Sequence, residues 1–478
     1  MGNGALFAKV IPNIKRVLDV ALVENVVLSG PVDHSSHGVP LNVTEFPRGE
    51  NISPVALCPP PHPYYSTMAA QISSVDPSEV GFDPTRLARI ENHFSKYITE
   101  KKLPGLHIAV TRGGKLAYET KVGFADVEAQ KPIADDTIYR IYSMTKPICS
   151  VAAMILWEEG LFELHDQVKW FIPSFANQKV FRSGTLTAPR FEPVSEPMEM
   201  WHLFSHTAGL TYGFVYSNPV DQMYRNAGFE WGTPRDKSLA EVIDILAELP
   251  LMFQPGTEWA YSMSIDVLGR AVEVLSGMTL GEFMKKRIFD PLGMNDTAFY
   301  CPADKADRLA ALYVPNPADK KIVRGDAMGA GALHAPTAEL GGGGLVSTMS
   351  DYITFAEMLR GGGEVNGVRI LSPRTVQMMG SNHLPNNADL TAYGRPLFSE
   401  TTFDGVGFGL GMSVTIDPVA AKVPGSAGDY GWGGAASTNF TVDPKEDLTY
   451  TIMTQLLPSS TWPIRSQLKQ LVYQALVD

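Results

Sequence analysis

The sequence predicts an α/β protein of the α+β type, with an antiparallel sheet flanked by helices and a helical subdomain inserted between two parts of the sheet. Two observations support this fold class. Apolar runs with strand-like patterns occur near residues 106–118 and again beyond residue 407, whereas residues 165–300 contain mainly helical patterns joined by long loops. Segments far apart in the sequence must therefore pair to complete the sheet.

The first 67 residues differ in composition from the rest of the chain. They contain nine prolines and no apolar periodicity, so we expect an irregular N-terminal extension, natural or an added leader, before a folded domain over residues 68–478. Pro12 and several charged residues interrupt the apolar stretch over residues 10–27, so we expect no secretory signal and a cytoplasmic protein. No run of 18 apolar residues occurs, and no membrane span is predicted.

The folded domain opens with a predicted helix and a strand pair. Asp83 suits an N-cap and Pro84 suits the first helical turn. Four apolar residues follow at helical spacing: Leu87, Ile90, Phe94 and Ile98. Apolar alternation over residues 106–110, a glycine turn at residues 113–114 and a second run over residues 116–118 then predict two antiparallel strands.

A long apolar helix is predicted next, from Ser143 to about Glu159, where Gly160 ends it. Two further helices are predicted in the middle of the chain, over residues 239–249 and 265–275. The second of these ends at Gly277.

Strand patterns return after the glycine run at residues 341–344. Three strands are predicted, over residues 407–416, 435–442 and 448–455. An amphipathic helix over residues 464–476 closes the chain. These elements assign the sheet part to about residues 75–140 and 300–478, and the helical part to about residues 141–299.

Charge and cysteine usage exclude several classes of function. Lysine plus arginine (39) and aspartate plus glutamate (51) give a net charge of −12 with no dense basic run, so nucleic acid is not an expected partner. The three cysteines, Cys58, Cys149 and Cys301, are odd in number and widely spaced, which fits neither a disulfide framework nor a zinc cluster. We expect free thiols.

Ser143 and Lys146 stand three residues apart at the start of the predicted long helix. On a helix this spacing places both side chains on one face, one turn apart. A serine hydroxyl becomes a strong nucleophile when a base takes its proton, and a lysine whose pKa is lowered by burial can be that base. The pair is therefore a candidate nucleophile with its base, although the S-x-x-K pattern is short and needs support.

Three further motifs provide that support. Tyr261-Ser262 follows a turn at residues 255–257 and leads directly into a helix, where a phenol can face a cleft. Gly431-Trp432-Gly433-Gly434 precedes a predicted strand, and its glycines allow backbone amides to approach a ligand closely. The segment Leu-Phe-Ser-His-Thr-Ala-Gly-Leu over residues 203–210 lies between the Ser143 motif and Tyr261.

In this order the motifs resemble the serine β-lactamase-like superfamily, most closely its class C branch and the family VIII carboxylesterases. The resemblance runs from about Val75 to the C-terminus and includes Asp-Pro-Leu-Gly-Met at residues 290–294 and Gly-Leu-Val-Ser-Thr at residues 344–348. It implies a β-lactamase/transpeptidase-like fold and a serine enzyme that needs neither a metal nor an organic cofactor.

The resemblance also implies roles for individual residues. Ser143 would attack a carbonyl carbon and form an acyl-enzyme, while Lys146 would hold the serine proton or orient it. Tyr261 would pass protons to the leaving group and from the deacylating water. The backbone N–H groups of Ser143 and Ala435 would hold the oxyanion, and removing one such donor typically costs about 10²–10³ in rate.

Two histidines suggest other chemistry. His206 invites a Ser-His-Asp triad, but the chain has no G-x-S-x-G elbow. His202 and His206 are spaced as zinc ligands are in H-E-x-x-H, but the glutamate is missing. We expect neither a triad nor a metal site, and the resemblance implies a structural role for the His206 segment.

Two departures from the lactamase pattern favour esters. Tyr261-Ser262-Met263 replaces Tyr-x-Asn, and Trp432-Gly433-Gly434 replaces Lys-Thr-Gly, so an amide, a cation and a hydroxyl that would bind a β-lactam are lost. The Trp432 indole would make the pocket apolar, and Trp-Gly-Gly resembles the family VIII form. An aromatic loop that includes Tyr212 and Phe214 either walls this pocket or packs the helical subdomain.

The sequence therefore predicts a serine hydrolase that cleaves small carboxylic esters with short to medium acyl chains; it assigns no oligomeric state. Alternatives with the same fold are an acyltransferase, a weak β-lactamase and a D-amino-acid peptidase. A non-catalytic relative that only binds an acyl or peptide ligand is a further alternative, but it would have no reason to keep Ser143, Lys146 and Tyr261 together.

Overall fold

The computed structural model describes residues 72–478. The expectations for residues 1–67, including a free thiol at Cys58, lie outside the described residues. Cys149 and Cys301 are buried free thiols, as predicted. Within the described range, no helix is long and apolar enough to cross a membrane.

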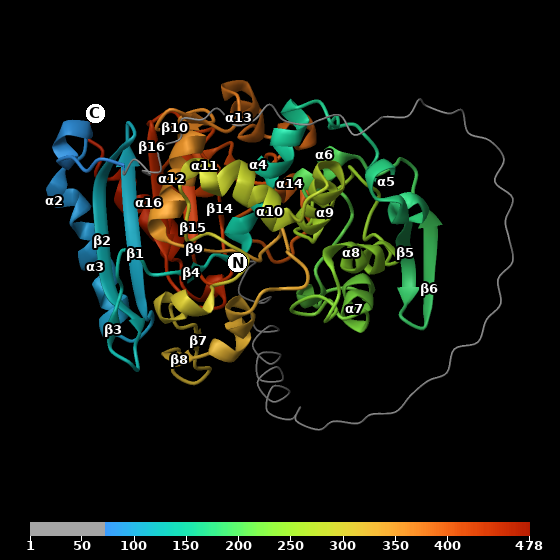
Figure 1. Cartoon of the computed structure of the whole chain (residues 1–478), viewed down its shortest axis with the longest axis horizontal. Helices are drawn as coiled ribbons and strands as arrows, with labels where there is room; N and C mark the ends of the chain where they lie inside the picture. The colour runs from blue at the N-terminus through green and yellow to red at the C-terminus, as the bar shows by residue number, and fades with distance from the viewer. Residues whose placement is uncertain (1–71) are drawn as a thin grey trace, which may run out of the picture. The chain divides into compact units, whose positions relative to one another are not determined.

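The centre of the fold is an eight-stranded antiparallel sheet (Figure 1). Its strand order is β12-β13-β14-β15-β16-β1-β2-β3. Three strands come from the N-terminal part: β1 (Gly105–Arg112), β2 (Lys115–Asp126) and β3 (Lys131–Pro132). Five come from the C-terminal part: β12 (Val406–Phe408), β13 (Ser413–Thr415), β14 (Tyr430–Gly433), β15 (Asn439–Asp443) and β16 (Leu448–Met453).

The two parts of the chain meet at β1, which pairs with β2 on one side and β16 on the other. In this register Val110 lies opposite both Tyr118 and Tyr450. Side chains alternate between the faces of a strand. Accordingly Ile108 and Val110 pack in one apolar cluster and Ala109 in another, so both faces of the sheet are buried.

Helices cover the two faces. On one face lie α2 (Pro84–Leu87), α3 (Arg89–Thr99) and α16 (Ile464–Tyr473), and Asp83 caps α2 by accepting hydrogen bonds from the Thr85 and Arg86 N–H groups. On the other face lies α12 (Met349–Arg360), where the Tyr352 ring packs against Phe440 of β15 at 5.2 Å. Figure 1 shows α3 and α12 on opposite sides of β1 and β2.

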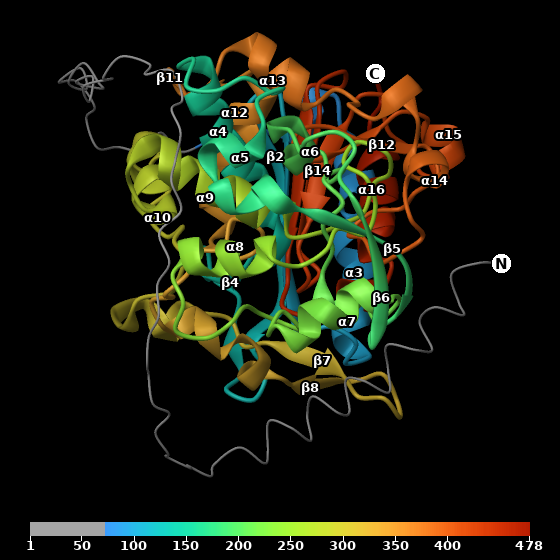
Figure 2. The ribbon, with the colours of Figure 1, turned by 90° about the vertical axis from the view of Figure 1, so that its right-hand side faces the viewer.

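The helical part is built around α4 (Thr145–Glu158), in which twelve consecutive residues from Thr145 to Leu156 are buried. It packs against α9 (Ser264–Ser276), which Gly277 ends in a left-handed conformation. The surrounding helices are α5 (Val168–Phe171), α6 (Met200–Phe204), α7 (Pro219–Asn226), α8 (Leu239–Ala247) and α10 (Leu280–Met284). A hairpin of β5 (Lys179–Thr185) and β6 (Ala188–Pro193) lies at its outer edge, at the right of Figure 1 and toward the viewer in Figure 2.

Shorter elements connect these layers. The strand pairs are β4 (Tyr139–Arg140) with β9 (Val346–Ser347), β7 (Tyr313–Pro315) with β8 (Ile322–Arg324), and β10 (Glu364–Val365) with β11 (Val368–Arg369). The short α-helices are α11 (Asp290–Leu292), α13 (Pro373–Met379), α14 (Leu390–Tyr393) and α15 (Pro418–Ala421). Short helices of the 3-10 or π type are η1 (Pro77–Val80), η2 (Tyr142–Met144), η3 (Pro173–Asn177), η4 (Gly213–Val215), η5 (Lys285–Phe289), η6 (Ala303–Arg308), η7 (Asp326–Leu333), η8 (Pro385–Asn387) and η9 (Ser459–Thr461).

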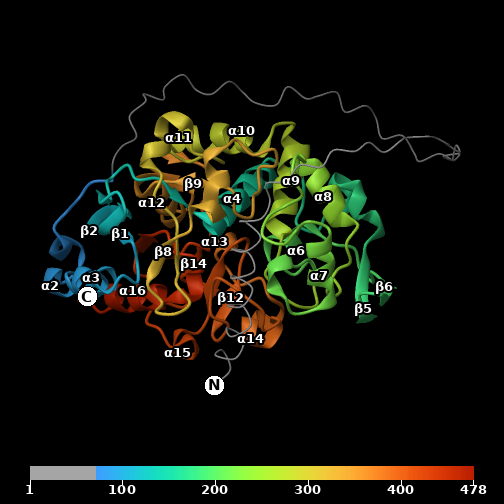
Figure 3. The same cartoon turned by 90° about the horizontal axis from the view of Figure 1, so that it is seen from below.

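The predicted sheet with an inserted helical part is confirmed (Figure 3), but three strand predictions need correction. The single strand predicted over residues 407–416 is a hairpin of β12 and β13, because the chain turns at Gly411, where φ is +89°. The strand predicted over residues 435–442 begins only at Asn439, and Ala435 lies in the preceding turn. The Gly431-Trp432-Gly433 segment, expected to precede a strand, is itself part of β14.

Candidate active site

Ser143 lies in the turn η2, directly before α4, and its side chain is half-buried. The preceding residue, Tyr142, has φ of +44°, a left-handed conformation that costs of order 1–3 kcal/mol in a non-glycine residue. Hydrogen bonds on both sides hold this turn: the Ile141 N–H donates to the Leu345 carbonyl, and the Tyr352 hydroxyl donates to the Met144 carbonyl. The serine is therefore presented on a rigid, strained turn.

Lys146 lies one turn further along and is fully buried. Its Nζ is 3.2 Å from Ser143 Oγ and donates a hydrogen bond of 2.5 Å to the Gly342 carbonyl. Burial lowers the pKa of Lys146 to about 8, an effect that the nearby Asp266 charge partly opposes. Near neutral pH the amine thus exists in both protonation states, as a general base requires.

Tyr261 reaches the same serine from the loop before α9. Its hydroxyl donates a hydrogen bond of 2.6 Å to Ser143 Oγ, and the Lys146 Nζ lies 4.6 Å from the centroid of its ring. Burial raises the pKa of Tyr261 above its ordinary value, so the phenol stays protonated at neutral pH. The structure therefore brings Ser143, Lys146 and Tyr261 together in one cluster.

Asp266 and Gly342 belong to this cluster but were not predicted. Asp266 is buried in the first turn of α9, and its Oδ1 accepts a hydrogen bond of 2.9 Å from the Gly342 N–H. A Cβ on Gly342 would lie 2.5 Å from Asp266 Oδ2, so only glycine fits there. Asp266 thereby fixes the position of Gly342, whose carbonyl accepts the hydrogen bond from Lys146. The glycine run and an aspartate on an apolar helix face were the available sequence signals.

The expected oxyanion donors lie on adjacent segments. The turn after β14 approaches the chain before Ser143 so closely that a Cβ on Gly434 would lie 2.2 Å from the Ile141 carbonyl oxygen. The Gly434 N–H donates to the Thr438 carbonyl and closes this turn. Ala435, the next residue, is half-exposed. This close approach places the Ala435 backbone beside the turn that carries Ser143.

Trp432 lies beside Tyr261. Its side chain is only 2% exposed, and its Nε1–H donates a long hydrogen bond of 3.4 Å to the Tyr261 hydroxyl oxygen. The indole packs against Phe408 and Tyr261 with ring separations of 5.2 and 5.3 Å. Trp432 is therefore enclosed by other rings and contacts the reacting groups at the Tyr261 hydroxyl.

Gly433 lies under a side chain from the last helix. A Cβ at this position would be 2.3 Å from the guanidinium carbon of Arg465. Arg465 pairs with the buried Glu400 carboxylate at 2.8 Å and donates to the Gly434 and Thr438 carbonyls. These contacts link α16 to the turn that carries Ala435.

The aromatic loop residues Tyr212 and Phe214 lie close to Tyr261. The Tyr212 ring packs edge-on against Tyr261 at 5.2 Å, and the Phe214 ring stacks on Tyr212 at 4.7 Å. Both side chains are half-buried, in contrast to Trp432. They are accessible from solvent next to the reacting groups.

The two histidines have structural surroundings. His206 is fully buried, its Nδ1 is 3.0 Å from Ser262 Oγ, and its ring packs edge-on against Tyr261 at 5.1 Å. Its carbonyl accepts the Ala260 N–H, so this residue supports the segment that carries Tyr261. His202 Nδ1 accepts the Glu199 N–H and caps α6.

Known proteins are similar to this chain over most of its length. Protein Rv1367c of Mycobacterium tuberculosis is 36% identical over 360 residues, which cover 74% of this chain and 86% of that protein. Esterase EstB of Burkholderia gladioli is 29% identical over 419 residues, which cover 84% of this chain and 99% of the esterase. The solved structure of EstCE1, described as a hydrolase with promiscuous acyltransferase activity, has a TM-score of 0.69 at 27% identity and covers 82% of this chain and 99% of its own.

The Beta-lactamase family model matches residues 90–474, which include every residue of the cluster described above. Together with the EstB and EstCE1 similarities, this match confirms the predicted superfamily and its fold. The chain belongs to the beta-lactamase family.

Proposed function

We propose that the protein is a serine hydrolase that cleaves carboxylic esters through an acyl-enzyme on Ser143. The observation that carries this proposal is the convergence of two proton carriers on one hydroxyl: Lys146 Nζ and the Tyr261 hydroxyl both lie within hydrogen-bond distance of Ser143 Oγ. One has a lowered pKa and the other a raised pKa, which suits a base and an acid respectively.

In the acylation step, neutral Lys146 takes the Ser143 proton as Oγ attacks the ester carbonyl carbon. The carbonyl oxygen becomes an oxyanion held by the N–H groups of Ser143 and Ala435. When this intermediate collapses, the C–O bond to the alcohol breaks and the Tyr261 hydroxyl donates its proton to the departing oxygen. The Trp432 N–H then stabilises the phenolate, because it already points at the Tyr261 oxygen.

Deacylation restores the starting protonation states of Tyr261, Lys146 and Ser143. Water gives a proton to the Tyr261 phenolate and adds to the acyl carbon. The second intermediate then expels Ser143 Oγ, which takes its proton back from the Lys146 ammonium. The cycle ends with neutral Lys146 and a protonated Tyr261, so no net proton is left on the enzyme.

Neutral esters with short to medium acyl chains fit this site better than β-lactams. Trp432 and Gly433 provide no cation or hydroxyl for a lactam carboxylate, and Met263 provides no amide. The nearest guanidinium, on Arg465, is occupied by the Glu400 carboxylate. EstB, the esterase similar to this chain, supports the same substrate class.

Acyl transfer to an alcohol is a second candidate function. The half-exposed rings of Tyr212 and Phe214 beside Tyr261 offer apolar surface to an alcohol that replaces water in deacylation. EstCE1, with its described acyltransferase activity, supports this possibility. Product analysis with added alcohol would measure the share of acyl groups transferred to the alcohol instead of water.

The ratio of kcat/KM for p-nitrophenyl butyrate to that for nitrocefin tests the proposed substrate class. We expect this ratio to exceed one by a wide margin, and the Ser143→Ala variant to lose the activity on both compounds. A ratio below one in the unmodified enzyme would overturn the esterase assignment in favour of a β-lactamase.

A further inference from the structure

A row of aromatic rings extends from Tyr261 to the surface of the helical part. Tyr212 packs edge-on against Tyr261, and Phe214 stacks on Tyr212 with an interplanar angle of 19°. Trp231 then stacks on Phe214 at 5.3 Å with an interplanar angle of 11°. Phe398 meets both Phe214 and Tyr261, at 5.9 and 6.3 Å. We call Tyr212, Phe214, Phe398 and Trp231 the aromatic row.

The aromatic row is accessible, unlike the other rings around Tyr261. Tyr212, Phe214 and Phe398 are half-buried, and the Trp231 side chain is 51% exposed. Trp259 and Trp432, which also contact the Tyr261 ring, are almost completely buried. Exposed aromatic surface that continues up to a reacting group is typical of a ligand site.

Backbone contacts hold the row in place. The segments that carry Phe214 and Trp231 touch directly, because a Cβ on Gly213 would lie 1.9 Å from the Phe229 carbonyl oxygen. The Arg225 guanidinium donates to the Gly213 carbonyl and pairs with Asp221 at 3.0 Å.

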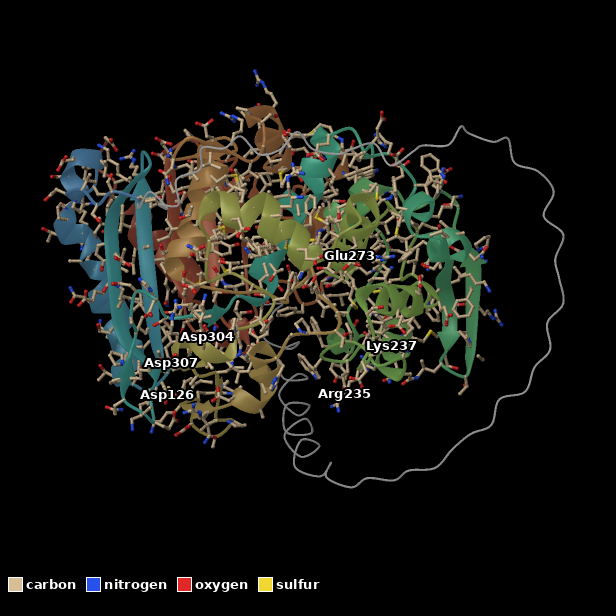
Figure 4. The ribbon with its side chains drawn as sticks, in the orientation of Figure 1. Asp126, Arg235, Lys237, Glu273, Asp304 and Asp307 are labelled. Carbon is tan, nitrogen blue, oxygen red and sulfur yellow. The ribbon has the colours of Figure 1, made fainter. Side chains whose placement is uncertain are left out.

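Asp221 fixes the same loop from its other side. It is fully buried, and it accepts hydrogen bonds of 2.6 and 2.9 Å from the Ser217 and Asn218 N–H groups. The segment continues beyond Trp231 to Arg235 and Lys237, which lie at the bottom of the helical part in the view of Figure 4. A site whose rings are already ordered loses less conformational entropy when it binds a ligand.

We infer that the aromatic row is the subsite for the alcohol part of the ester and that it selects alcohols with a flat aromatic ring system. This inference rests on the proposed function. There Tyr261 gives its proton to the departing alcohol oxygen, so the alcohol leaves on the side of Tyr261, where the row begins. The four rings carry no charge, which favours a neutral alcohol.

An aromatic alcohol should bind to the aromatic row more strongly than a saturated alcohol of the same size, because only aromatic rings form stacked or edge-on pairs with the row. Aromatic pairs in stacked or edge-on geometry are worth about 0.5–1.5 kcal/mol beyond the area that they bury. For a flat ring against the row, this corresponds to roughly a 2- to 10-fold preference over a saturated ring system with the same carbon skeleton.

The test compares 2-naphthylmethyl acetate with decahydro-2-naphthylmethyl acetate, which share the acetyl group, the primary alcohol and the carbon skeleton. We expect kcat/KM to be about 2- to 10-fold higher for the naphthyl ester. The preference should fall toward one in Trp231→Ala and in Phe214→Ala. It should persist in Trp170→Ala, a matched control because Trp170 is 61% exposed but lies on α5, outside the row.

Two results would overturn the inference. One is an equal kcat/KM for the two esters in the unmodified enzyme, or a naphthyl preference that remains unchanged in Phe214→Ala. The other is a preference that appears only when the rings are moved to the acyl side, in methyl 2-naphthylacetate against its decahydro analogue.

Calorimetry with the Ser143→Ala variant separates this inference from the proposed function. Tighter binding of the naphthyl ester than of its decahydro analogue by this variant would support the aromatic subsite without turnover, and equal binding would overturn it. The proposed function would fail on a different result, the absence of p-nitrophenyl butyrate hydrolysis by the unmodified enzyme.

Discussion

The pH dependence of ester hydrolysis follows from the burial of Lys146. Because burial lowers the pKa of Lys146 to about 8, the ammonium form predominates below that pH and the free amine above it. Only the free amine can accept the Ser143 proton, so kcat/KM should rise with pH and level off above about pH 8. One pH unit below the pKa, about a tenth of the enzyme carries the free amine, so kcat/KM at pH 7 should be about a tenth of its plateau.

The Asp266→Asn variant tests the cause of this profile. The Asp266 charge raises the pKa of Lys146, whereas the amide oxygen of asparagine keeps an acceptor for the Gly342 N–H. Removing the charge should therefore lower the apparent pKa and bring the rate at pH 7 closer to the plateau. Asp244→Asn, at an exposed position on α8, serves as the control and should leave the profile unchanged.

The assay is pH-stat titration of the acid released from an alkyl butyrate between about pH 6 and 10, in which kcat/KM reports the ionisation of the free enzyme. A flat profile between about pH 6 and 9 would refute neutral Lys146 as the base. A shift of the Asp266→Asn profile to higher pH would also refute it, because loss of the Asp266 charge should lower the apparent pKa and not raise it.

Three further predictions concern the support of the site. Gly433→Ala should lower both Tm and ester turnover, because its Cβ would meet Arg465, and an unchanged Tm in a thermal scan would contradict this. His206→Ala should lower Tm more than kcat, because a buried hydrogen bond is lost and alanine does not favour the left-handed backbone at φ of +57°; an inactive variant with unchanged Tm would reverse the roles. A chain that begins at Met68 retains every described element and should match the full chain in Tm and in p-nitrophenyl butyrate hydrolysis, and a large loss of either would show that residues 1–67 contribute.

The parts of the site that depend on local geometry were predictable from sequence. The spacing of Ser143 and Lys146 is a property of one helix start, and the order of the motifs placed Tyr261 with them. The alternation over residues 106–110 and the Gly277 helix end likewise depend on neighbours in the sequence. Such features need no knowledge of distant contacts.

The remaining features depend on contacts between distant segments. Asp266 acts on Lys146 through Gly342, which is 76 residues away in the sequence. Nothing in the motif around Trp432 shows that the rings of Phe408 and Tyr261 enclose its indole. The β12–β13 hairpin resembled one strand because only residues 409–412 separate its two short strands, and Gly411 is the one turn signal with a left-handed backbone among them.

The central claim is that Ser143 is the nucleophile that carries the acyl group. A fluorophosphonate probe followed by intact-mass analysis tests it most directly, because the probe forms a stable covalent bond with an activated serine. We predict one label per chain on Ser143, no label in Ser143→Ala and much slower labelling in Lys146→Ala. Labelling of the Ser143→Ala protein at the rate of the unmodified enzyme would contradict the claim.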